Sequence, residues 1–274
     1  MCFTDADIVI VDKNVVISAS NILRGGNHPQ NKANIWWHTF INEPRYLINP
    51  FFAAFEISSQ SIPTYEEFCD EHQRCCGVLR RAFPKARIVD YNAAAYQGAY
   101  ALIEEITSGY EAEVAFLQAV APLIAVRNPK YRLKKIEEAL FDCARRFGLG
   151  RPTLSLLASL SCLYEGASKE SSSPARPVLK PKSTYTKLEA HNAIMDLYAL
   201  QLLIQSTAKI NKKIALCTSD KGLLRFWCAL KVKPGGTVTT DGFNFNMELS
   251  RAMFPSLDEL AILDLQQRVK TYGF

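Results

Sequence analysis

Two short apolar runs near opposite ends of the chain constrain its fold more than any other feature. Ile8–Val11 reads IVIV and is followed at once by Asp12, and Ile214–Cys217 reads IALC and is followed three residues later by Asp220. Runs that are continuously apolar, instead of alternating, are typical of parallel strands buried on both faces. A long helical pattern at 188–210 leads directly into the second run. We therefore expect a three-layer α/β/α fold, in which helices cover both faces of a central, mainly parallel sheet.

The stretch between the two runs is mainly helical in pattern. Four segments read as helices, and the last two of them have charged outer faces. They are residues 51–58, 63–82, 96–126 and 131–147. Residues 86–89 read as one further strand. The length of 274 residues suits one enlarged domain, so we expect a single domain over 1–274 with a helical insertion at about 60–167.

The composition changes at residues 168–183, which read SKESSSPARPVLKPKS. Three prolines and a serine run disfavour a helix, and the segment has little apolar surface to bury. We therefore expect a flexible basic loop over about 168–184. Cations in and near this loop, with one that follows Asp220, are candidates for weak contacts with nucleic-acid phosphates. They are Arg176, Lys180, Lys182, Lys187 and Lys221.

The composition is that of an ordinary globular protein with a mildly basic balance. The chain has 32 Lys and Arg against 27 Asp and Glu, and this charge of +5 permits a polyanionic partner without requiring one. Acids near the N-terminus argue against a secretory signal, and no apolar stretch reaches the ~20 residues of a membrane span. The eight cysteines show no zinc-ligand spacing, so we expect reduced, mostly buried thiols. These features predict a cytoplasmic protein without membrane contact.

Four carboxylates lie in apolar settings, where a charge is unfavourable unless something compensates it. Asp12 and Asp220 follow the two strand-like runs, and ligands bind beyond the carboxyl ends of strands in open α/β sheets. Asp196 lies inside the apolar helical pattern before the second run, and Glu56 lies in FFAAFEIS. A divalent cation explains all four, because Mg²⁺ or Mn²⁺ neutralises clustered carboxylates and prefers hard oxygen ligands.

At these positions the sequence resembles the PIN-domain nuclease family. IVIVDKNVVIS matches the family's opening strand and Asp-x-Asn, which makes Asp12 a metal ligand and Asn14 a polar support. Glu56, on a helical pattern 44 positions later, takes the place of the second family acid. DLYALQLLIQSTAKINKKIALCTSD matches the family's order of Asp, apolar helix, strand and Thr-x-Asp, which makes Asp196 and Asp220 the third and fourth acids.

The resemblance implies a metal-dependent phosphodiesterase that acts mainly on RNA, with Mg²⁺ or Mn²⁺ held by the four acids. Water would attack the phosphorus in line and leave a 5′-phosphate and a 3′-hydroxyl. Thr218 and Ser219 would support the outer carboxylate oxygens. PIN domains often serve as toxins or in phage defence, and dimers are common. We therefore expect an endoribonuclease, with RNA, an inhibitory or activating protein and a second copy of the chain as candidate partners.

Several alternatives stay open at this point. The 140 residues between Glu56 and Asp196 exceed the spacing in minimal PIN domains, so the second acid could instead be another carboxylate. The candidates are Asp90, Glu104 and Glu105. The family often has a further acid soon after Thr-x-Asp, and here only Asp241 is a weak substitute. An inactive core that binds RNA or protein as a scaffold therefore also fits.

A phosphatase that resembles the haloacid dehalogenase family is a further alternative. Such enzymes begin with an apolar strand and an Asp nucleophile, but they need a second Asp two residues on, where this chain has Asn14. Asp12 taken alone could also cap the following helix. Trp36, Trp37 and His38 are candidates for stacking on unpaired bases, although such residues more often anchor a core. His191 could reach a phosphate or could simply be hydrogen-bonded.

Overall fold

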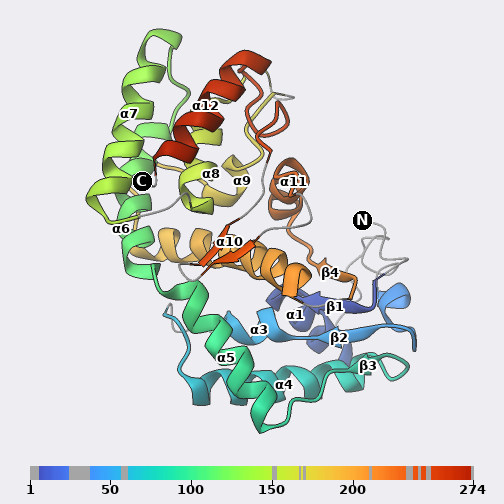
Figure 1. Cartoon of the computed structure of the whole chain (residues 1–274). Coiled ribbons are helices and arrows are strands. Elements are labelled where there is room, and N and C mark those ends of the chain that lie inside the picture. Colours follow the sequence, from blue (N-terminus) through green and yellow to red (C-terminus); the bar gives the residue numbers. More distant parts are fainter. Residues whose placement is uncertain are drawn as a thin grey trace. The chain divides into compact units, whose positions relative to one another are not determined.

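The structure is a computed structural model that describes residues 6–24, 38–56, 61–149, 153–166, 168, 171–209, 212–232, 237–239, 242–244 and 248–272. For 207–209, 237–239 and 242–244 it describes the backbone. The chain divides into two compact units, and most of their helices and strands are labelled in Figure 1. The first unit comprises Met1–Thr107 and Leu202–Ser219, and the second comprises Ser108–Gln201 and Asp220–Phe274.

A four-stranded sheet organises the first unit. Its strands are β1 (Ile8–Val11), β2 (Leu47–Asn49), β3 (Arg87–Ile88) and β4 (Ile214–Cys217). All neighbouring strands are parallel, and their order across the sheet is β3-β2-β1-β4. The α/β class, the two buried runs and the strand near 86–89 are therefore confirmed. Strand β2, by contrast, is not evident from the sequence pattern.

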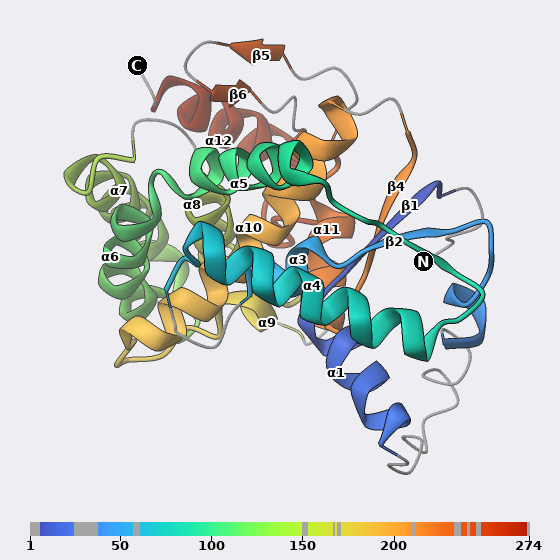
Figure 2. The same ribbon diagram turned by 90° about the horizontal axis from the view of Figure 1, so that it is seen from below.

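One face of this sheet packs against α1 (Lys13–Leu23), α3 (Phe51–Phe55) and α4 (Tyr65–Ala82). Val9 and Val11 lie two positions apart on β1, so they point to the same face and join Leu79 of α4 in one buried cluster. Ile10 points to the opposite face and is only 4% exposed, so this face is covered as well. Figure 2 shows α3 and α4 lying side by side, in agreement with their contacts.

The helices of the first unit begin where the sequence provides a cap. Thr64 caps α4, because its hydroxyl accepts a bond from the Glu67 amide at 3.3 Å while the Glu67 carboxylate accepts one from the Thr64 amide at 2.8 Å. This reciprocal capping box satisfies two amides that a helix start otherwise leaves unpaired. The predicted helix at 63–82 therefore begins at Tyr65. A further helix of this unit, α5, spans Ala93–Thr107.

The described part of the second unit is mainly helical. Its elements are α6 (Tyr110–Val120), the 3₁₀ helix η1 (Ala121–Ile124), α7 (Lys130–Arg146), α8 (Leu154–Leu163), α9 (Arg176–Leu179), α11 (Lys221–Ala229), the antiparallel pair β5 (Thr237–Thr239) and β6 (Gly242–Asn244), and α12 (Glu259–Thr271). Helix α10 (Lys187–Lys209) begins in the second unit and ends in the first, shortly before β4.

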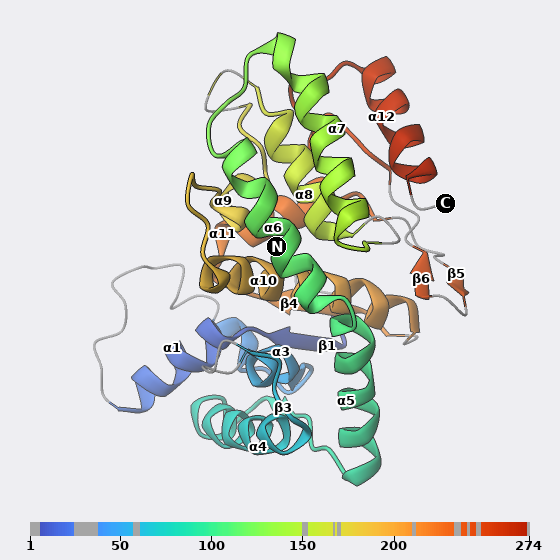
Figure 3. The ribbon, with the colours of Figure 1, turned by 90° about the vertical axis from the view of Figure 1, so that its left-hand side faces the viewer.

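Helix α8 is the core of the second unit. All ten of its residues are buried, in keeping with a helix that has no charged residue and is mostly apolar. Figure 3 shows it beside α6 and α7, which both contact it. Its serines are satisfied internally: Ser159 donates to the Ser155 carbonyl at 2.8 Å and Ser161 to the Met253 carbonyl at 2.6 Å. None of the described helices is long and apolar enough to cross a membrane.

The predicted helical insertion at 60–167 coincides only in part with the second unit. Helices α4 and α5 belong to the first unit with the sheet, and the second unit also includes elements after Ser219. The single helix predicted at 96–126 is wrong, because this segment is divided into α5, α6 and η1. Gly109 forms the N-cap of α6, and Pro122 lies in η1, where the tighter winding of a short 3₁₀ helix ends the segment.

The prediction of a helix-free loop at 168–184 is also wrong. Among its described residues, Arg176–Leu179 form α9. Pro177 fits there because a proline is tolerated in the first turn of a helix, where its missing amide would have no partner. Val178 and Leu179 are 3% and 2% exposed, so the segment buries apolar surface that its average composition conceals.

One buried carboxylate joins three parts of the second unit. Glu137 of α7 is 1% exposed and accepts a hydrogen bond from the hydroxyl of Tyr164, which follows α8. It also pairs with Arg268 of α12 at 2.9 Å and with Lys134 at 3.2 Å. Burial raises the pKa of Glu137, but the bonds from Tyr164, Arg268 and Lys134 outweigh this effect. The pKa therefore lies below its usual value.

The lowered pKa of Glu137 predicts how the protein responds to acid. The pKa of Glu137 is lower in the folded state than in the unfolded state. The ionised carboxylate therefore stabilises the fold fully when the pH is above its unfolded-state pKa, and this stabilisation is lost as the pH falls through its folded-state pKa. We expect the free energy of unfolding to fall between about pH 5 and pH 3, and to fall less steeply in Glu137→Gln. Urea titrations followed by circular dichroism at each pH measure this. Glu138→Gln, a substitution at an exposed neighbour on α7, should keep the wild-type slope, and equal slopes in all three proteins would contradict the prediction.

Candidate functional site

The candidate site lies at the carboxyl edge of the sheet, between β1 and β4. After β1 the chain forms β2 and β3, which extend the sheet on one side of β1. It then forms β4, which pairs with the other edge of β1. Such a reversal of strand order is the switch point at which open α/β sheets bind their ligands. Val11 pairs with Cys217, and the Asp12 amide donates to the Cys217 carbonyl at 3.2 Å. The next residues on the two strands, Asp12 and Thr218, are therefore neighbours at this edge.

Asp12 is a buried N-cap at this switch point. Its side chain is the cap of α1: Oδ1 accepts a hydrogen bond from the Val15 amide at 2.9 Å. The residue is only 8% exposed, so the structure keeps a carboxylate largely out of water at the end of a strand. Burial, followed by the Asp12 charge, raises the pKa of the Cys217 thiol to about 12, so that thiol is neutral at physiological pH. The capping role of Asp12 is thus confirmed. The same residue also lies at the sheet edge where open α/β folds bind ligands.

Lys13, directly after Asp12, forms an ion pair with Glu71 of α4 and donates to the Ala53 carbonyl at 3.4 Å. Arg74 pairs with the same carboxylate at 2.6 Å. Burial alone raises the pKa of Glu71, but the hydrogen bonds from Arg74 and Lys13 bring it below its usual value. The cation beside Asp12 is therefore held by an acid of another helix, a partnership that the sequence does not indicate.

Asn49 and Tyr91 extend the polar edge along β2 and β3. Asn49 ends β2, and its amide donates to the Tyr91 hydroxyl at 2.9 Å while its Oδ1 accepts from the Phe51 amide at 3.0 Å. The ring of Tyr91 stacks on His72, with centroids 4.3 Å apart. Burial raises the pKa of Tyr91 to about 12 and lowers that of His72 to about 4, so both are neutral at pH 7. The only sequence signal for Asn49 is a polar residue between an apolar pair and a proline.

The remaining first-unit residues of the predicted site are more exposed. Glu56 lies at the C-cap of α3, one residue beyond the helix in which it was expected, and its amide donates to the Phe52 carbonyl at 3.0 Å. Its side chain is half-buried. Asn14 is exposed in the first turn of α1, and Ser219 is exposed after β4. The structure thus brings Asp12 and Thr218 together at the switch point, with the other residues on flanking segments.

Asp196 and Asp220 belong to the second unit. Asp196 is half-buried on α10, between the buried residues Met195 and Leu197. Asp220 caps α11, because its Oδ1 accepts from the Leu223 amide at 2.9 Å. A Cβ at Gly222 would lie 3.0 Å from Asp220 Oδ1 and 2.7 Å from a Pro177 carbon, so only glycine fits beside this cap. The four acids therefore occur as one pair in each unit. No group of three or more His, Cys, Asp or Glu that could hold a metal ion is found among the described residues.

The alternative residues occupy ordinary positions. Asp90 is 88% exposed and pairs with Arg80 at 3.2 Å, and Glu104 and Glu105 are exposed on α5. His38 is hydrogen-bonded to Ser18 at 3.3 Å and packs on Phe83, as a core anchor would. His191 is buried and bonded to the Tyr110 hydroxyl at 2.7 Å, which matches the structural alternative. Trp36, Trp37 and Asp241 lie outside the described residues.

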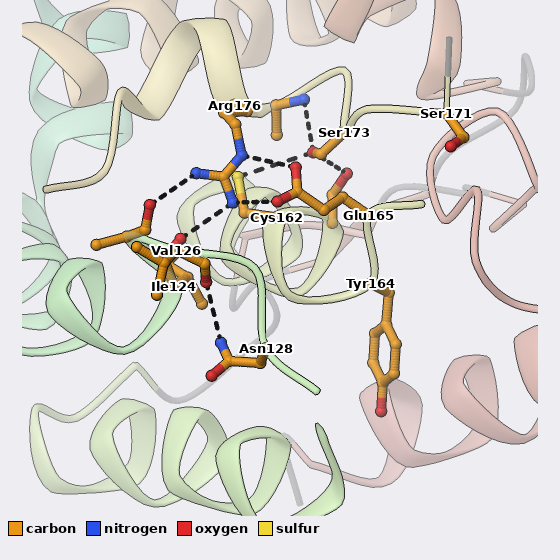
Figure 4. Close-up of polar contacts among 12 residues, drawn as sticks. Ile124, Val126, Asn128, Cys162, Tyr164, Glu165, Ser171, Ser173 and Arg176 are labelled. Carbon is orange, nitrogen blue, oxygen red and sulfur yellow. Dashed lines mark hydrogen bonds and ion pairs between the residues drawn. The ribbon is translucent and has the colours of Figure 1, made fainter. Parts of the chain in front are cut away.

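Most of the predicted phosphate-binding cations have protein partners. Arg176 forms a two-pronged ion pair with Glu165, with both N–O distances 2.6 Å, and donates to the carbonyls of Ile124 and Ala125 (Figure 4). Lys182 pairs with Glu189 at 2.5 Å, and Lys187 pairs with Glu111 at 3.3 Å. Lys180 and Lys221 are exposed. Arg176 is thus a structural residue of the second unit rather than a solvent-facing cation.

Comparison with known proteins finds no similar protein. The chain matches no protein-family model, no curated protein and no solved structure.

The N-cap at Asp12 predicts a difference between two substitutions. Asp12→Ala removes the bond to the Val15 amide and should lower the free energy of unfolding by about 1 kcal/mol, whereas Asp12→Asn keeps a capping oxygen and should change it by a few tenths at most. Urea unfolding of both variants measures this. Asn14→Ala, at an exposed position in the same turn, is the control and should stay within about 0.5 kcal/mol of the wild type. Equal losses for Asn and Ala would show that the cap is not what Asp12 contributes.

Proposed function

We propose that this protein is a Mg²⁺- or Mn²⁺-dependent nuclease with a PIN-like three-layer fold, and that its substrate is RNA cut internally. One observation carries the proposal: Asp12, 8% exposed, lies at the switch point of a parallel sheet, beside Thr218. This edge is where such sheets bind ligands, and a carboxylate there is a ligand that hard divalent cations accept. Glu56, Asp196 and Asp220 would complete the site.

The donor set at this edge suits a hard cation. Asp12 offers carboxylate oxygens, and Thr218 and Ser219 offer hydroxyl groups, which are ligands or supports that Mg²⁺ and Mn²⁺ accept. The cap bond from Val15 occupies one of about four acceptor positions of the Asp12 carboxylate. A thiol would favour softer metals, but the raised pKa of Cys217 keeps it protonated.

The connectivity of the chain supports the inclusion of the second-unit acids. Asp220 is two residues beyond Thr218, so its backbone begins at the same edge of the sheet. Asp196 lies on α10, which is the helix that precedes β4. The proposal is that Asp196 and Asp220 bind the same metal ion as Asp12 and Glu56.

Each residue then has a separate task. The bound metal would supply Lewis acidity toward the phosphate and a more acidic water. Asp12 and Asp220 would hold it with carboxylates whose orientation is fixed by their caps, and Glu56 and Asp196 would add charge. Thr218 and Ser219 would orient the outer carboxylate oxygens, with Asn14 as a further polar support. In-line attack by water would leave a 5′-phosphate and a 3′-hydroxyl.

The cellular setting is part of the same proposal. A toxin or phage-defence nuclease is kept silent by an inhibitor or trigger, and a second copy of the chain is a candidate partner. Buried cysteines such as Cys75, Cys162 and Cys217 are free, and burial raises the pKa of each thiol to about 12. Neutral buried thiols of this kind suit a reducing cytoplasm.

The decisive experiment compares RNA cleavage by single variants. With single-stranded RNA and Mn²⁺, we expect EDTA to abolish cleavage, and Asp12→Asn and Asp220→Asn each to lower it by at least about 100-fold, since even supporting residues of metal sites contribute 10- to 100-fold. Asp12→Asn is informative because it preserves the cap. Asp70→Asn, at an exposed position of α4, is the matched control and should keep wild-type activity.

The other outcomes point to the alternatives. Cleavage that survives chelation and both substitutions would eliminate the proposal. RNA binding without cleavage in the wild type would favour the scaffold. An acid-stable phosphoenzyme that disappears in Asp12→Asn would identify a phosphatase. The second acid is identified by measuring RNA cleavage in Glu56→Gln, Asp90→Asn, Glu104→Gln and Glu105→Gln, since the substitution of that acid should lower the rate most.

A further inference from the structure

A second feature of the chain, separate from the acids, is an exposed basic surface at the start of α7. Residues 127–135 read RNPKYRLKK, which contains five basic residues and no acid. They are Arg127, Lys130, Arg132, Lys134 and Lys135, and all five are exposed. Within the part of the chain that the structure describes, only Lys134 forms an ion pair, with Glu137. We call these five residues, together with the exposed Tyr131, the α7 basic surface.

The position of Lys130 and Arg132, in the first turn of α7, is unfavourable for the protein alone. The N-terminus of a helix carries a partial positive charge, so cations in the first turn are repelled and acids are favoured there. Helix α7 has no acid in its first turn, and its N-cap, Pro129, makes no side-chain capping bond. Helices α4 and α6 each have two acids in the first turn. An anion bound at the start of α7 would remove this repulsion.

Tyr131 adds an aromatic ring to the same surface. It is 85% exposed, which is unusual for a residue that could bury a large apolar area. It stands between Lys130 and Arg132 in sequence, and Lys135 lies one helical turn further along on the same face. An exposed aromatic ring on a basic surface is the kind of platform on which bases of single-stranded nucleic acids stack.

A pocket adjoins this surface. It has a volume of about 580 Å³ and is lined by Arg127, Asn128, Lys130, Glu165 and Ser256, among others. This size lies within the range of small-molecule sites, about 300–1,000 Å³, and it can hold a nucleobase with its sugar. Two cations of the α7 basic surface therefore stand at the wall of a space that an unstacked nucleotide could enter.

Hydrogen bonds hold the wall of the pocket in place, as Figure 4 shows. The Asn128 amide donates to the carbonyls of Leu123 at 2.8 Å and Val126 at 3.3 Å, which fixes the turn before α7. Arg176 donates to the carbonyls of Ile124 and Ala125 in the same turn. A phosphate that meets Arg127 here meets a preorganised backbone, so less conformational entropy is lost on binding.

Arg176 also removes an electrostatic obstacle. Glu165 lines the pocket, and its charge alone would repel a phosphate. Its two oxygens are paired with the Arg176 guanidinium at 2.6 Å each, and its side chain is only 9% exposed. The pocket wall is therefore close to neutral at Glu165 and positive at Arg127 and Lys130.

We propose that the α7 basic surface binds the phosphate backbone of single-stranded RNA, that Tyr131 stacks on one base, and that the adjoining pocket receives a neighbouring nucleotide. The choice of RNA rests on the proposed nuclease function, and the charge and the stacking ring are independent of it. The α7 basic surface contains none of the four acids, so its loss would weaken binding while leaving the acids intact.

The test measures RNA binding in EDTA, so that cleavage does not contribute. A fluorescein-labelled 12-nucleotide single-stranded RNA is titrated with the full chain, and anisotropy is followed at several salt concentrations. Each phosphate contact on a single strand contributes about 0.7 to the salt slope, so Arg127→Gln/Lys130→Gln should lower the slope by about 1.4 and weaken binding about 25-fold at 0.1 M salt. Tyr131→Ala should weaken it by about 5- to 150-fold, and Tyr131→Phe should not.

A matched double variant separates this surface from general charge. Arg251→Gln/Lys270→Gln removes two exposed cations of the second unit and should bind RNA like the wild type. Urea unfolding confirms that each variant folds. Equal effects of the two double variants, an unchanged salt slope, or binding to phosphatidylserine vesicles in place of RNA would overturn the proposal. If the protein cleaves RNA in an EDTA-sensitive way but the α7 variants bind RNA like the wild type, only the proposal for this surface is rejected. If binding depends on the α7 residues but no cleavage occurs, only the proposed nuclease function is rejected.

Discussion

The parallel pairing of β1 with β4 is the interaction on which the first unit depends. It joins residues 206 positions apart, so closing the intervening chain carries a large entropic cost that local contacts cannot offset. Continuous burial offsets it: Val9 and Val11 are almost inaccessible on one face, and Ile10 and Leu216 on the other. The same pairing creates the switch point, and it aligns Asp12 with Thr218. The pairing of β1 with β4 therefore determines both the arrangement of the sheet and the position of the candidate site.

The structural and the functional interpretations of the acids are compatible. Asp12 and Asp220 each follow a strand and each cap the next helix. A cap fixes the rotamer of the carboxylate and holds it near the positive end of a helix, where the negative charge is favoured. That is also the preorganisation that a metal ligand requires. A carboxylate in this position can serve both purposes, and only a substitution that keeps one of them, such as Asp to Asn, tells them apart.

The sequence predicts those parts of the fold that follow from continuous patterns. The strands at 8–11 and 214–217 appear within the expected bounds because both runs are continuously apolar, as buried parallel strands are. Strand β2 is not predicted because its three residues, Leu47–Asn49, are too few to show a periodicity. The role of Asn49 at the sheet edge is missed for the same reason. The partnership of Lys13 with Glu71 depends on the packing of α1 on α4, which a local pattern does not contain.

Charge is the property for which the sequence is least informative, because its meaning depends on partners. Arg176 lies in a proline- and serine-rich segment that suggests exposure, yet two carboxylate oxygens and two carbonyls surround its guanidinium. Lys182 and Lys187 are also paired. The cations at the start of α7 differ because the acids within a helical turn of them, Glu137 and Glu138, both follow the basic run, and Glu137 already holds Lys134 and Arg268. Cations that form no ion pair among the described residues, at the end of a helix that repels them, are more informative about a partner than a count of basic residues is.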